Sequence, residues 1–303
     1  MISHLTLWVV RDGKPGHENQ SLGLAEALGR QANVTIHGIH LTPGESLLDR
    51  LRSAFHQAKK LPRPDLILGA GHTTHVALIA LARRTGSPCV VLMKPSLPAM
   101  LFDLCIVPQH DLRGQPGEGV IATMGALNRV PAPVAGPRDG RLMLIGGPSA
   151  SHGWDGEAVL NAIGEILATS PGAPWELTDS RRTPEGFREA LRERFPQLVV
   201  FPHEETGPEW LPARLSRAGE TWVTEDSVSM IHEALSSGSK VGLLPVPWKK
   251  PRGRIARGLA RLIVEGFVTT FRDWREIHVL DDPPMVLREA DRCAKLVLLR
   301  WFA

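Results

Sequence analysis

The residues best suited to chemistry lie in the segment 221–235, TWVTEDSVSMIHEAL. An apolar stretch ends at Thr224, acidic and hydroxyl residues follow, and a helical pattern then begins, with Asp226 or Thr224 as its expected N-cap. The first amides of a helix have no intrahelical partner and carry a partial positive charge. This turn, with the hydroxyls of Ser227 and Ser229, is therefore suited to bind a diphosphate.

The helix after this turn also offers a carboxylate. Helical spacing puts Asp226, Ser229 and Glu233 on one face, and Met230 among the apolar residues of another. Glu233 is thus expected to accept hydrogen bonds from ribose hydroxyls, as acidic residues do in other nucleotide folds. The alternative is that Asp226 and Ser227 only cap the helix and that Glu233 is a solvated surface residue.

A second polar segment, DGKPGHENQ at 12–20, precedes a helix expected to begin near Gln20. Gly13 and Gly16 permit backbone conformations that are closed to other residues. Asp12 and His17 are candidates for a general base and its orienting partner acting on an acceptor hydroxyl. A structural loop in which Asp12 bonds its own turn is the alternative.

Three more segments combine glycine, hydroxyl or basic residues: GAGHTT at 69–74, GGP at 146–148 and SRRTP at 180–184. Gly146 and Gly147 would let the backbone approach a phosphate, and Arg181 and Arg182 would neutralise its charge, although arginines at a helix start are also commonly solvated. His72 and His75 are three residues apart, but the sequence positions no third ligand beside them. No metal site is predicted.

These segments share one position, because each follows a short β-rich apolar run. Strands are expected at 5–10, 34–39, 66–69, 89–93, 104–107 and 120–123 and, after a stretch rich in proline and glycine, at 142–145, 175–178, 198–201, 221–224 and 241–245. Helical patterns separate them, which predicts an α/β protein of two doubly wound, Rossmann-like domains with parallel sheets that face a cleft. Ligands bind such sheets beyond the carboxyl ends of the strands.

The expected domains cover residues 1–137 and 138–283, and a final helix, 284–303, is expected to pack on a domain face. A length of 303 residues suits two domains. No apolar run approaches the roughly 18 to 20 residues of a membrane span, and the N-terminal apolar run resembles a strand more than a secretion signal, so a cytoplasmic protein is predicted. Three scattered cysteines, Cys89, Cys105 and Cys293, are expected in the core.

The formal charge of +3 and the pI near 8.9 fall short of the concentrated basic field of a nucleic-acid-binding protein, so no nucleic-acid partner is expected. Charge is nevertheless concentrated locally. From Lys249 to Arg261 there are six basic residues and no acidic one. This segment is either an exposed helix face or a contact with an anionic membrane surface, which would make the protein peripheral on the inner face of a membrane.

The motif TEDSVSM at 224–230, followed by Glu233, Ala234 and Gly238, resembles the C-terminal motif of the mitochondrial-fission Elm-like family, which is grouped with the glycosyltransferases of the GT-B superfamily. Family-like stretches also occur at 12–20, 69–74, 107–111, 145–148 and 180–184. More distantly, the helix is similar to the donor-binding helix of the N-acetylglucosaminyltransferase that acts on lipid-linked peptidoglycan precursors. There, an acidic residue matching Glu233 contacts the uridine ribose.

The resemblance implies a metal-independent transferase that uses a nucleotide-diphosphate-sugar as substrate, without a cofactor, and an acceptor in the cell envelope. A nucleotide-sugar epimerase and a non-catalytic nucleotide-sugar-binding or membrane-associated adaptor are the alternatives. With Asp12 and His17 as the catalytic candidates, the expected donor-binding residues are Gly146, Gly147, Ser180, Arg181, Arg182, Thr224, Glu225, Asp226, Ser227, Ser229, Met230 and Glu233. The expected acceptor-side residues are Gly13, Gly16, Gln20, Gly71, His72, Thr73 and His110.

Overall fold

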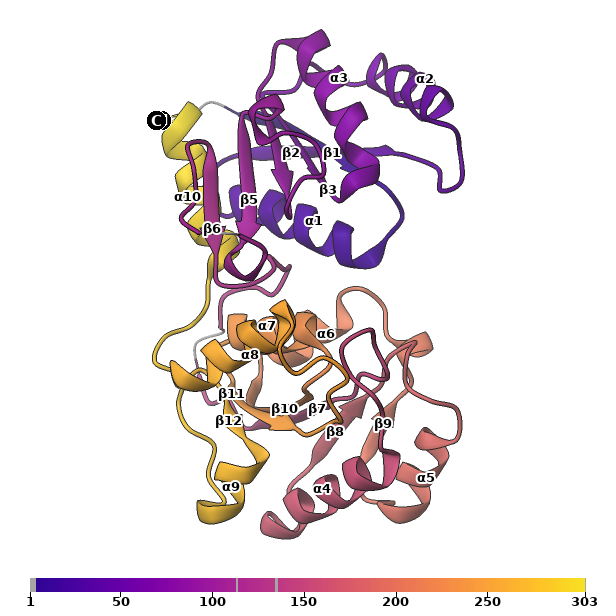
Figure 1. Ribbon diagram of the computed structural model, residues 1–303, viewed down its shortest axis with the longest axis vertical. Helices are drawn as coiled ribbons and strands as arrows, with labels where there is room; N and C mark the ends of the chain where they lie inside the picture. Colours follow the sequence, from indigo (N-terminus) through magenta and orange to yellow (C-terminus); the bar gives the residue numbers. More distant parts are fainter. Residues whose placement is uncertain (1–3, 113, 134–135, 303) are drawn as a thin grey trace. The chain divides into compact units, whose positions relative to one another are not determined.

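The computed structural model describes residues 4–112, 114–133 and 136–302, which form two compact units (Figure 1). The outermost residues of the expected first and last segments, Met1 and Ala303, lie outside the described residues. The chain leaves the first unit after Arg129, rather than after residue 137, and returns to it at Arg288. It returns because the last helix, α10 (Glu289–Trp301), buries its apolar stripe in the first core, including Cys293 and Val297.

The first unit contains one parallel sheet with strand order β2-β1-β3-β4-β5-β6. Each strand begins at the residue where its apolar run begins. The inner strands β3, β4 and β5 are buried along their whole length and are accordingly continuously apolar, whereas the edge strand β2 is mostly exposed. The strands are β1 (Leu5–Arg11), β2 (Val34–His40), β3 (Leu66–Ala70), β4 (Cys89–Leu92), β5 (Leu104–Pro108) and β6 (Val120–Thr123).

Helices cover both faces of this sheet, and alternate residues of β1 face different layers. Leu7 and Val9 pack with α1 (Pro15–Gly29) and α10, whereas Trp8 and Val10 pack with α2 (Leu47–Ala58) and α3 (His75–Thr85). The prediction that α1 starts near Gln20 is wrong. Pro15, whose ring fixes the helical φ angle, occupies the first turn, and Gly16, His17 and Gln20 are therefore helical residues.

The second unit repeats the arrangement with strand order β12-β11-β10-β7-β8-β9. Five of its six strands coincide closely with the predicted runs; the sixth, β12, is only two residues long and carries no readable pattern. The strands are β7 (Gly140–Leu144), β8 (Trp175–Thr178), β9 (Val199–Phe201), β10 (Ala218–Thr224), β11 (Lys240–Leu244) and β12 (Thr269–Thr270). The expected class of two doubly wound parallel sheets is confirmed.

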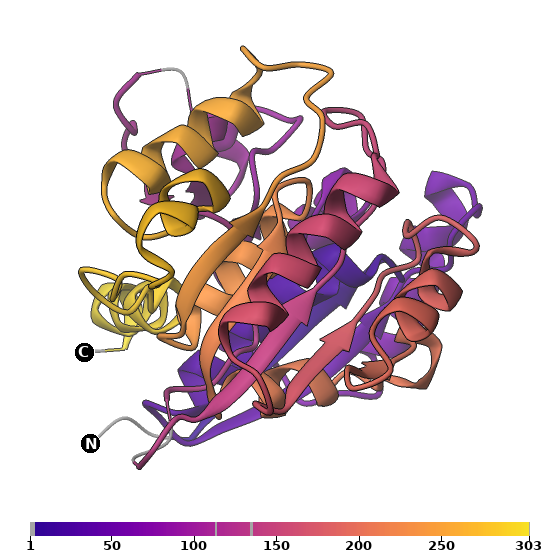
Figure 2. The same cartoon turned by 90° about the horizontal axis from the view of Figure 1, so that it is seen from below.

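The helices of this unit also form two layers, as the two ribbon views show (Figures 1 and 2). On one face lie α4 (Gly156–Thr169), α5 (Phe187–Arg194) and α9 (Phe271–Ile277), whose apolar residues pack around Trp222. On the other lie α6 (Trp210–Leu215), α7 (Val228–Ser236) and α8 (Arg254–Val264). No helix in the described part of the chain is both long and apolar enough to cross a membrane.

Each sheet has one point where successive connections leave in opposite directions. In the first unit it lies between β1 and β3, because β2 is on the far side of β1, and in the second it lies between β7 and β10. Loops diverge there and leave a crevice beyond the carboxyl ends of the two strands. Most of the predicted site residues follow these same four strands, whereas Ser180, Arg181 and Arg182 follow β8 and His110 follows β5.

We predict that Gly23→Ala lowers the free energy of unfolding by about 1–3 kcal/mol. Gly23 lies in α1, and an added Cβ atom would come within 2.4 Å of the backbone oxygen of Asn128, which cannot rotate away. In the same helix, a Cβ at Gly29 would meet nothing within 4 Å, so Gly29→Ala is the matched control. It should be neutral or stabilising by up to about 1 kcal/mol. Urea denaturation measures the free energy of unfolding of both variants. Equal values would contradict the close contact between Gly23 and the Asn128 backbone.

Candidate functional site

At the crevice of the second unit, the loops after β7 and β10 are joined by two hydrogen bonds. The amide of Gly146 donates to Thr224 Oγ1 at 2.8 Å, and the amide of Gly147 donates to Asp226 Oδ2 at 3.0 Å. Both acceptor residues are buried. The structure therefore brings together the glycine loop and the TED motif, which are about eighty residues apart in the sequence.

A third loop joins them through Arg182. Its Nη2 lies 2.8 Å from Asp226 Oδ2, and its Nη1 donates to the carbonyl oxygen of Gly147 at 2.6 Å. The Asp226 side chain is 0% exposed and that of Arg182 is 39% exposed, so Asp226 holds the loops in place. Arg181 has no such ion pair in the described part of the chain and is exposed, so its guanidinium is available to a ligand.

The loop after β8 is shaped by its own hydroxyl groups. Thr183 Oγ1 donates to the carbonyl oxygen of Gly146 at 2.6 Å and accepts the Ser180 amide at 2.9 Å. Ser180 Oγ in turn accepts the Arg182 amide at 3.2 Å. The sequence pattern SRRTP thus makes a tight turn that presents Arg182 beside the glycine loop, and the helix α5 begins only at Phe187.

The N-cap of α7 is Ser227, not Asp226 or Thr224 as predicted. Both predicted caps bond to the glycine loop instead of the helix amides. Asp226 accepts the Gly147 amide, and Thr224 accepts the Gly146 amide. The first helical hydrogen bond runs from the Ile231 amide to the Ser227 carbonyl oxygen at 3.1 Å. The amides of residues 228–230, which include those of Ser229 and Met230, precede it and mark the positive end of the helix dipole.

Two glutamates flank this helix start. Glu233 is half-buried in the following turn of α7. Burial raises the pKa of Glu225, although hydrogen bonds with the Val246 backbone and the Trp248 side chain oppose the shift. The carboxylate of Glu225 therefore holds the loop after β11 in place through Val246 and Trp248. Its role is structural, in contrast to the donor-binding role predicted for it.

In the first unit, Asp12 and His17 are in direct contact. Asp12 is 4% exposed, and its Oδ2 lies 2.8 Å from His17 Nδ1 and accepts the Thr73 hydroxyl. Burial opposes ionisation of Asp12, but the hydrogen bonds from Thr73, His17 and the Lys14 amide outweigh it and lower its pKa. A buried carboxylate bound to Nδ1 orients the imidazole so that Nε2 faces away from it.

The other acceptor-side residues support this pair to different degrees. Gly71, at φ +82°, packs so closely that an added Cβ atom would lie 2.2 Å from the His17 ring, and Gly13, at φ +75°, makes the turn after Asp12. Gln20 Nε2 donates to the Gly16 carbonyl oxygen at 3.3 Å. His72 is exposed beside Thr73 in the 3-10 helix His72–Thr74.

His110 lies apart from the pair. It is in the 3-10 helix Gln109–Asp111 after β5, and β4 separates β5 from β3. Its Nε2 is 3.9 Å from Asp111 Oδ2, a contact with its own neighbour in the sequence. The order of the strands, which the apolar runs do not determine, therefore sets His110 two strands away from the loop of Thr73.

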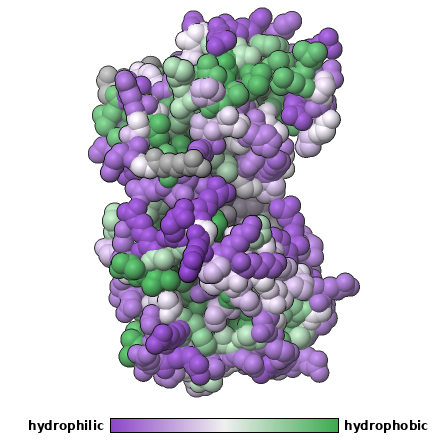
Figure 3. All heavy atoms as spheres, in the orientation of Figure 1, coloured by the Kyte–Doolittle hydropathy of each residue, from purple (hydrophilic) through white to green (hydrophobic). Residues whose placement is uncertain are grey.

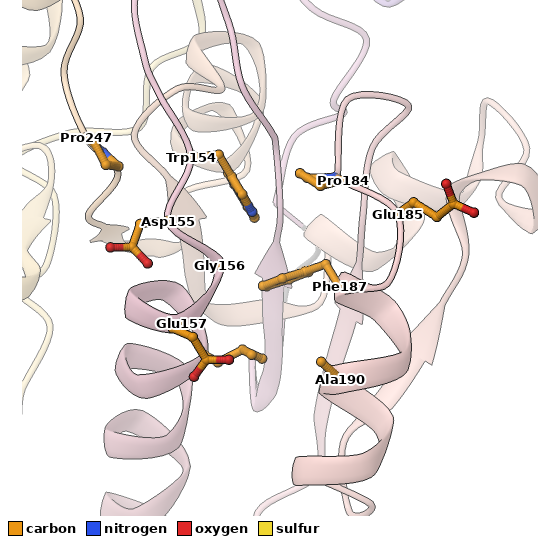
Figure 4. A pocket seen from close by; sticks show the side chains of 10 residues that line it. Trp154, Asp155, Gly156, Glu157, Pro184, Glu185, Phe187, Ala190 and Pro247 are labelled. Atoms are coloured by element: carbon orange, nitrogen blue, oxygen red, sulfur yellow. The ribbon is translucent and has the colours of Figure 1, made fainter.

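Two cavities lie beside the predicted site residues or the neighbouring loops, and their linings differ in charge. One, of about 220 Å³, has Asp12 and Thr73 on its wall together with the cations Lys14 and Arg50. The other, of about 580 Å³, lies at the start of α4 and α5, where Trp154 and Phe187 meet edge to face at 5.2 Å (Figure 4). Its described lining contains three carboxylates, Asp155, Glu157 and Glu185, and neither lysine nor arginine. These carboxylates disfavour a diphosphate in this cavity.

Sequence reasoning missed two groups that follow strands of the second unit. Asp179 Oδ2 accepts Arg188 Nε at 2.8 Å and Nη2 at 2.7 Å, and its Oδ1 accepts the His203 amide at 2.8 Å. Ligand atoms of Asp179, His203 and Glu204 all lie within 4.8 Å of one another, but the Arg188 guanidinium supplies the positive charge of this cluster. The second group surrounds His152, which follows β7. The available signal for Asp179 was its place directly after β8, whereas His152 lies eight residues beyond the end of β7 and carried no such signal.

The two parallel sheets, each with polar loops at its switch point, define a protein of the two-domain, Rossmann-like GT-B fold. The fold is similar to that of UDP-GlcNAc 2-epimerase from Methanocaldococcus jannaschii, with a TM-score of 0.58, 12% identity and coverage of 97% of this chain and 100% of that one. MurG from Acinetobacter baumannii gives a TM-score of 0.52 at 12% identity over 98% of this chain and 99% of that one.

The sequence itself identifies the family. The family model described as mitochondrial fission ELM1 matches residues 15–301, and the chain belongs to this family. It is also 22% identical over 299 residues to the uncharacterized protein RP120 of Rickettsia prowazekii (strain Madrid E), covering 80% of this chain and 84% of that protein. The expected family resemblance is confirmed.

We predict that Asp226→Ala lowers the free energy of unfolding by about 2–4 kcal/mol, because it leaves Arg182 and the Gly147 amide without their buried acceptor. Glu185→Ala is the control, since Glu185 is an exposed carboxylate in the neighbouring loop, and it should change stability by less than about 0.5 kcal/mol. Chemical denaturation at neutral pH measures both. An Asp226→Ala protein as stable as the control would show that Asp226 does not hold the loops together.

Proposed function

We propose that this protein is a metal-independent glycosyltransferase whose second unit binds a nucleotide-diphosphate-sugar and whose first unit activates the acceptor. The observation that carries the proposal is the Asp12–His17 pair at the first switch point, 2.8 Å apart and backed by Thr73. Such a pair is suited to remove a proton from a hydroxyl group. The GT-B fold and the family membership support a substrate of the nucleotide-sugar class.

On the donor side, the start of α7 receives the diphosphate. The amides of residues 228–230, the Ser229 hydroxyl and the Arg181 guanidinium offer hydrogen bonds and positive charge. The backbone of Gly146 and Gly147 allows close approach, and Glu233 accepts from the ribose. Thr224, Asp226 and Arg182 keep these groups in position through the contacts that join the three loops.

On the acceptor side, the geometry favours His17 as the base and Asp12 as its orienting partner. His17 Nε2 takes the proton of the acceptor hydroxyl while the hydroxyl oxygen attacks the anomeric carbon of the sugar. The bond between that carbon and the diphosphate breaks, and the departing diphosphate keeps the electron pair. Lys14 and Arg50, on the wall of the neighbouring cavity, favour an acceptor that carries an anionic group, as many cell-envelope precursors do.

An epimerase is the second candidate, because folds of this type include UDP-GlcNAc 2-epimerase. A panel of nucleotide sugars separates the candidates. A transferase moves the sugar slowly to water and faster to an acceptor, and releases nucleoside diphosphate in both cases. An epimerase instead returns an isomerised nucleotide sugar. Nuclear magnetic resonance of the reaction mixture detects both products. Binding without either product would support a non-catalytic adaptor and contradict the proposal.

For the transferase, we predict that His17→Gln lowers kcat by about 100-fold or more, because glutamine keeps a polar side chain but cannot accept the proton. Its affinity for the nucleotide sugar should be unchanged, since the donor groups lie in the second unit. The matched control is His56→Gln, an exposed histidine of α2 in the same unit, which should behave as wild type. Turnover and calorimetric affinity are measured together, and normal turnover in His17→Gln would remove the base from the proposal.

Asp12→Asn tests the orienting role through pH. The pKa of Asp12 is lowered in the folded protein, so its ionised form stabilises the fold above the pKa of the unfolded chain, near 4, and this contribution is lost as the pH falls through the folded value. The wild type should therefore be more stable than Asp12→Asn at pH 7, and the difference should shrink in acid. A stability difference that is the same at pH 7 and pH 3 would contradict the assignment.

We also propose that the basic segment 249–261 contacts an anionic membrane surface. Its six cations are exposed, and over the α8 region Figure 3 shows hydrophilic side chains next to apolar ones. The triple variant Lys250→Gln, Arg252→Gln, Arg257→Gln should bind phosphatidylglycerol vesicles about 100-fold more weakly, since each cation contributes about 1 kcal/mol. The control triple Lys59→Gln, Lys60→Gln, Arg63→Gln removes exposed cations from the first unit. Equal vesicle sedimentation of both triples would exclude this surface.

A further inference from the structure

His152 is a buried imidazole without a hydrogen-bonding partner. It is 0% exposed, and neither Nδ1 nor Nε2 has a partner among the described residues. The same is true of one oxygen of the nearby buried carboxylate, Asp226 Oδ1. Buried polar groups are ordinarily satisfied, because each one left unpaired costs about 1–3 kcal/mol. Two such groups beside the proposed diphosphate site call for a functional explanation.

The fold holds His152 over the end of β10. Because β10 lies between β11 and β7, the loops after these two strands can meet across it. They do so through the Gly153 amide, which donates to the Pro247 carbonyl oxygen at 2.6 Å, and the Lys249 amide, which donates to the Ser151 carbonyl oxygen at 2.8 Å. His152 pairs with Trp248 in this bridge, and their rings lie 3.8 Å apart.

The charges around His152 come from each loop packed near it. Asp226 belongs to the turn after β10 and Arg182 to the loop after β8, and they act on the imidazole in opposite directions. From the loop after β11 come Lys249, whose Nζ lies 3.4 Å from the Ser149 carbonyl oxygen, and Trp248, which hydrogen-bonds Glu225. Burial is the largest influence and lowers the pKa of His152, so the ring is neutral at pH 7 in the free protein.

We propose that His152 takes up a proton when the diphosphate of a nucleotide sugar binds, and that the resulting imidazolium is held by Asp226. This inference rests on the donor site of the proposed function. A diphosphate at the α7 start brings negative charge close to His152 and offsets the positive charge of Arg182, which disfavours a proton on the ring in the free protein. Arg182 stays paired with Asp226 Oδ2, and the unpartnered Oδ1 of Asp226 is available to accept from the protonated ring.

The proton comes from solvent, and no covalent bond forms or breaks. Because binding raises the pKa of His152, nucleotide sugar should bind more tightly as the pH falls through the range between the free and bound values. Each unit by which the pKa rises corresponds to about a tenfold difference in affinity between low and high pH. His152 is thus a positioning residue that favours an occupied diphosphate site and has no role for a nucleoside without phosphates.

Calorimetry with UDP-N-acetylglucosamine tests the proposal. Its diphosphate is esterified at both ends and does not titrate near neutral pH, so proton exchange reports on the protein. Titrations at pH 7 in two buffers of different ionisation enthalpy give the number of protons exchanged. We expect wild type to take up a proton fraction that approaches one, and the affinity to weaken from pH 6 to pH 8 by about tenfold or more.

The variant His152→Gln should bind UDP-N-acetylglucosamine with no net proton uptake and with a flat pH dependence. His56→Gln, an exposed histidine outside both proposed sites, should retain the wild-type uptake. For an independent readout that needs no variant, the Hε1 resonance of His152 in the wild type should titrate at a higher pH with ligand than without. Unchanged titration of that resonance would overturn the proposal even if His152→Gln fails to fold.

The outcomes separate the two proposals. Binding without proton exchange, or uptake that persists in His152→Gln, overturns the role of His152 and leaves the donor site standing. A protein that binds UDP-N-acetylglucosamine at no pH from 6 to 8 overturns the proposed donor site for this ligand, and the inference falls with it. Uptake that is lost only in His152→Gln supports both.

Discussion

The buried carboxylate of Asp226 is the constraint on which the second unit's site depends. One of its oxygens accepts the Gly147 amide and pairs with Arg182, so a single group fixes the loops that follow β7, β8 and β10. Because an unpaired buried carboxylate is costly, these loops cannot separate without a large loss of stability. The α7 start is consequently presented to a ligand in one arrangement, as tight binding of a small anion requires.

The first unit meets the same requirement in a similar way. Asp12 follows β1 and accepts from Thr73, which follows β3, so again a buried carboxylate joins two loops across a switch point. The difference lies in the partner. Asp226 is paired with an arginine, which stays charged and keeps the loops in place, whereas Asp12 is paired with a histidine, which can exchange a proton near neutral pH. In the proposed function, Asp226 therefore serves binding and Asp12 serves proton transfer.

The fold by itself does not choose among activities. Similar two-domain architectures occur in a UDP-GlcNAc 2-epimerase and in MurG, at about one identical residue in eight. Transferase activity is therefore proposed on particular groups, chiefly the Asp12–His17 pair, and not on the sheets that carry them. Particular groups also distinguish the aromatic cavity beside α4 from the cavity beside Asp12. The cavity beside α4 is the larger of the two, but its carboxylates disfavour a phosphate.

The apolar runs determined the strands and the doubly wound class, because a strand buried on both faces must be apolar along its length. The polar residues after those runs predicted that Asp12, Gly146, Thr224 and Asp226 lie beyond the strand ends, since the carboxyl ends of parallel strands share one edge. The two-residue β12 and the start of α1 could not be read. Two residues carry no periodicity, and the local pattern of glycines at 13 and 16 favoured a loop over the helix that Pro15 begins.

What only the tertiary structure decided is which groups face one another. The order of the strands put Thr73 against Asp12 and left His110 two strands away, and it brought the loops after β7 and β11 together over His152. The position of Ser227 at the N-cap of α7 accompanies the same pairings, because Asp226 and Thr224 accept the amides of the glycine loop. Such pairings depend on contacts between residues far apart in the chain, and local pattern carries no record of them.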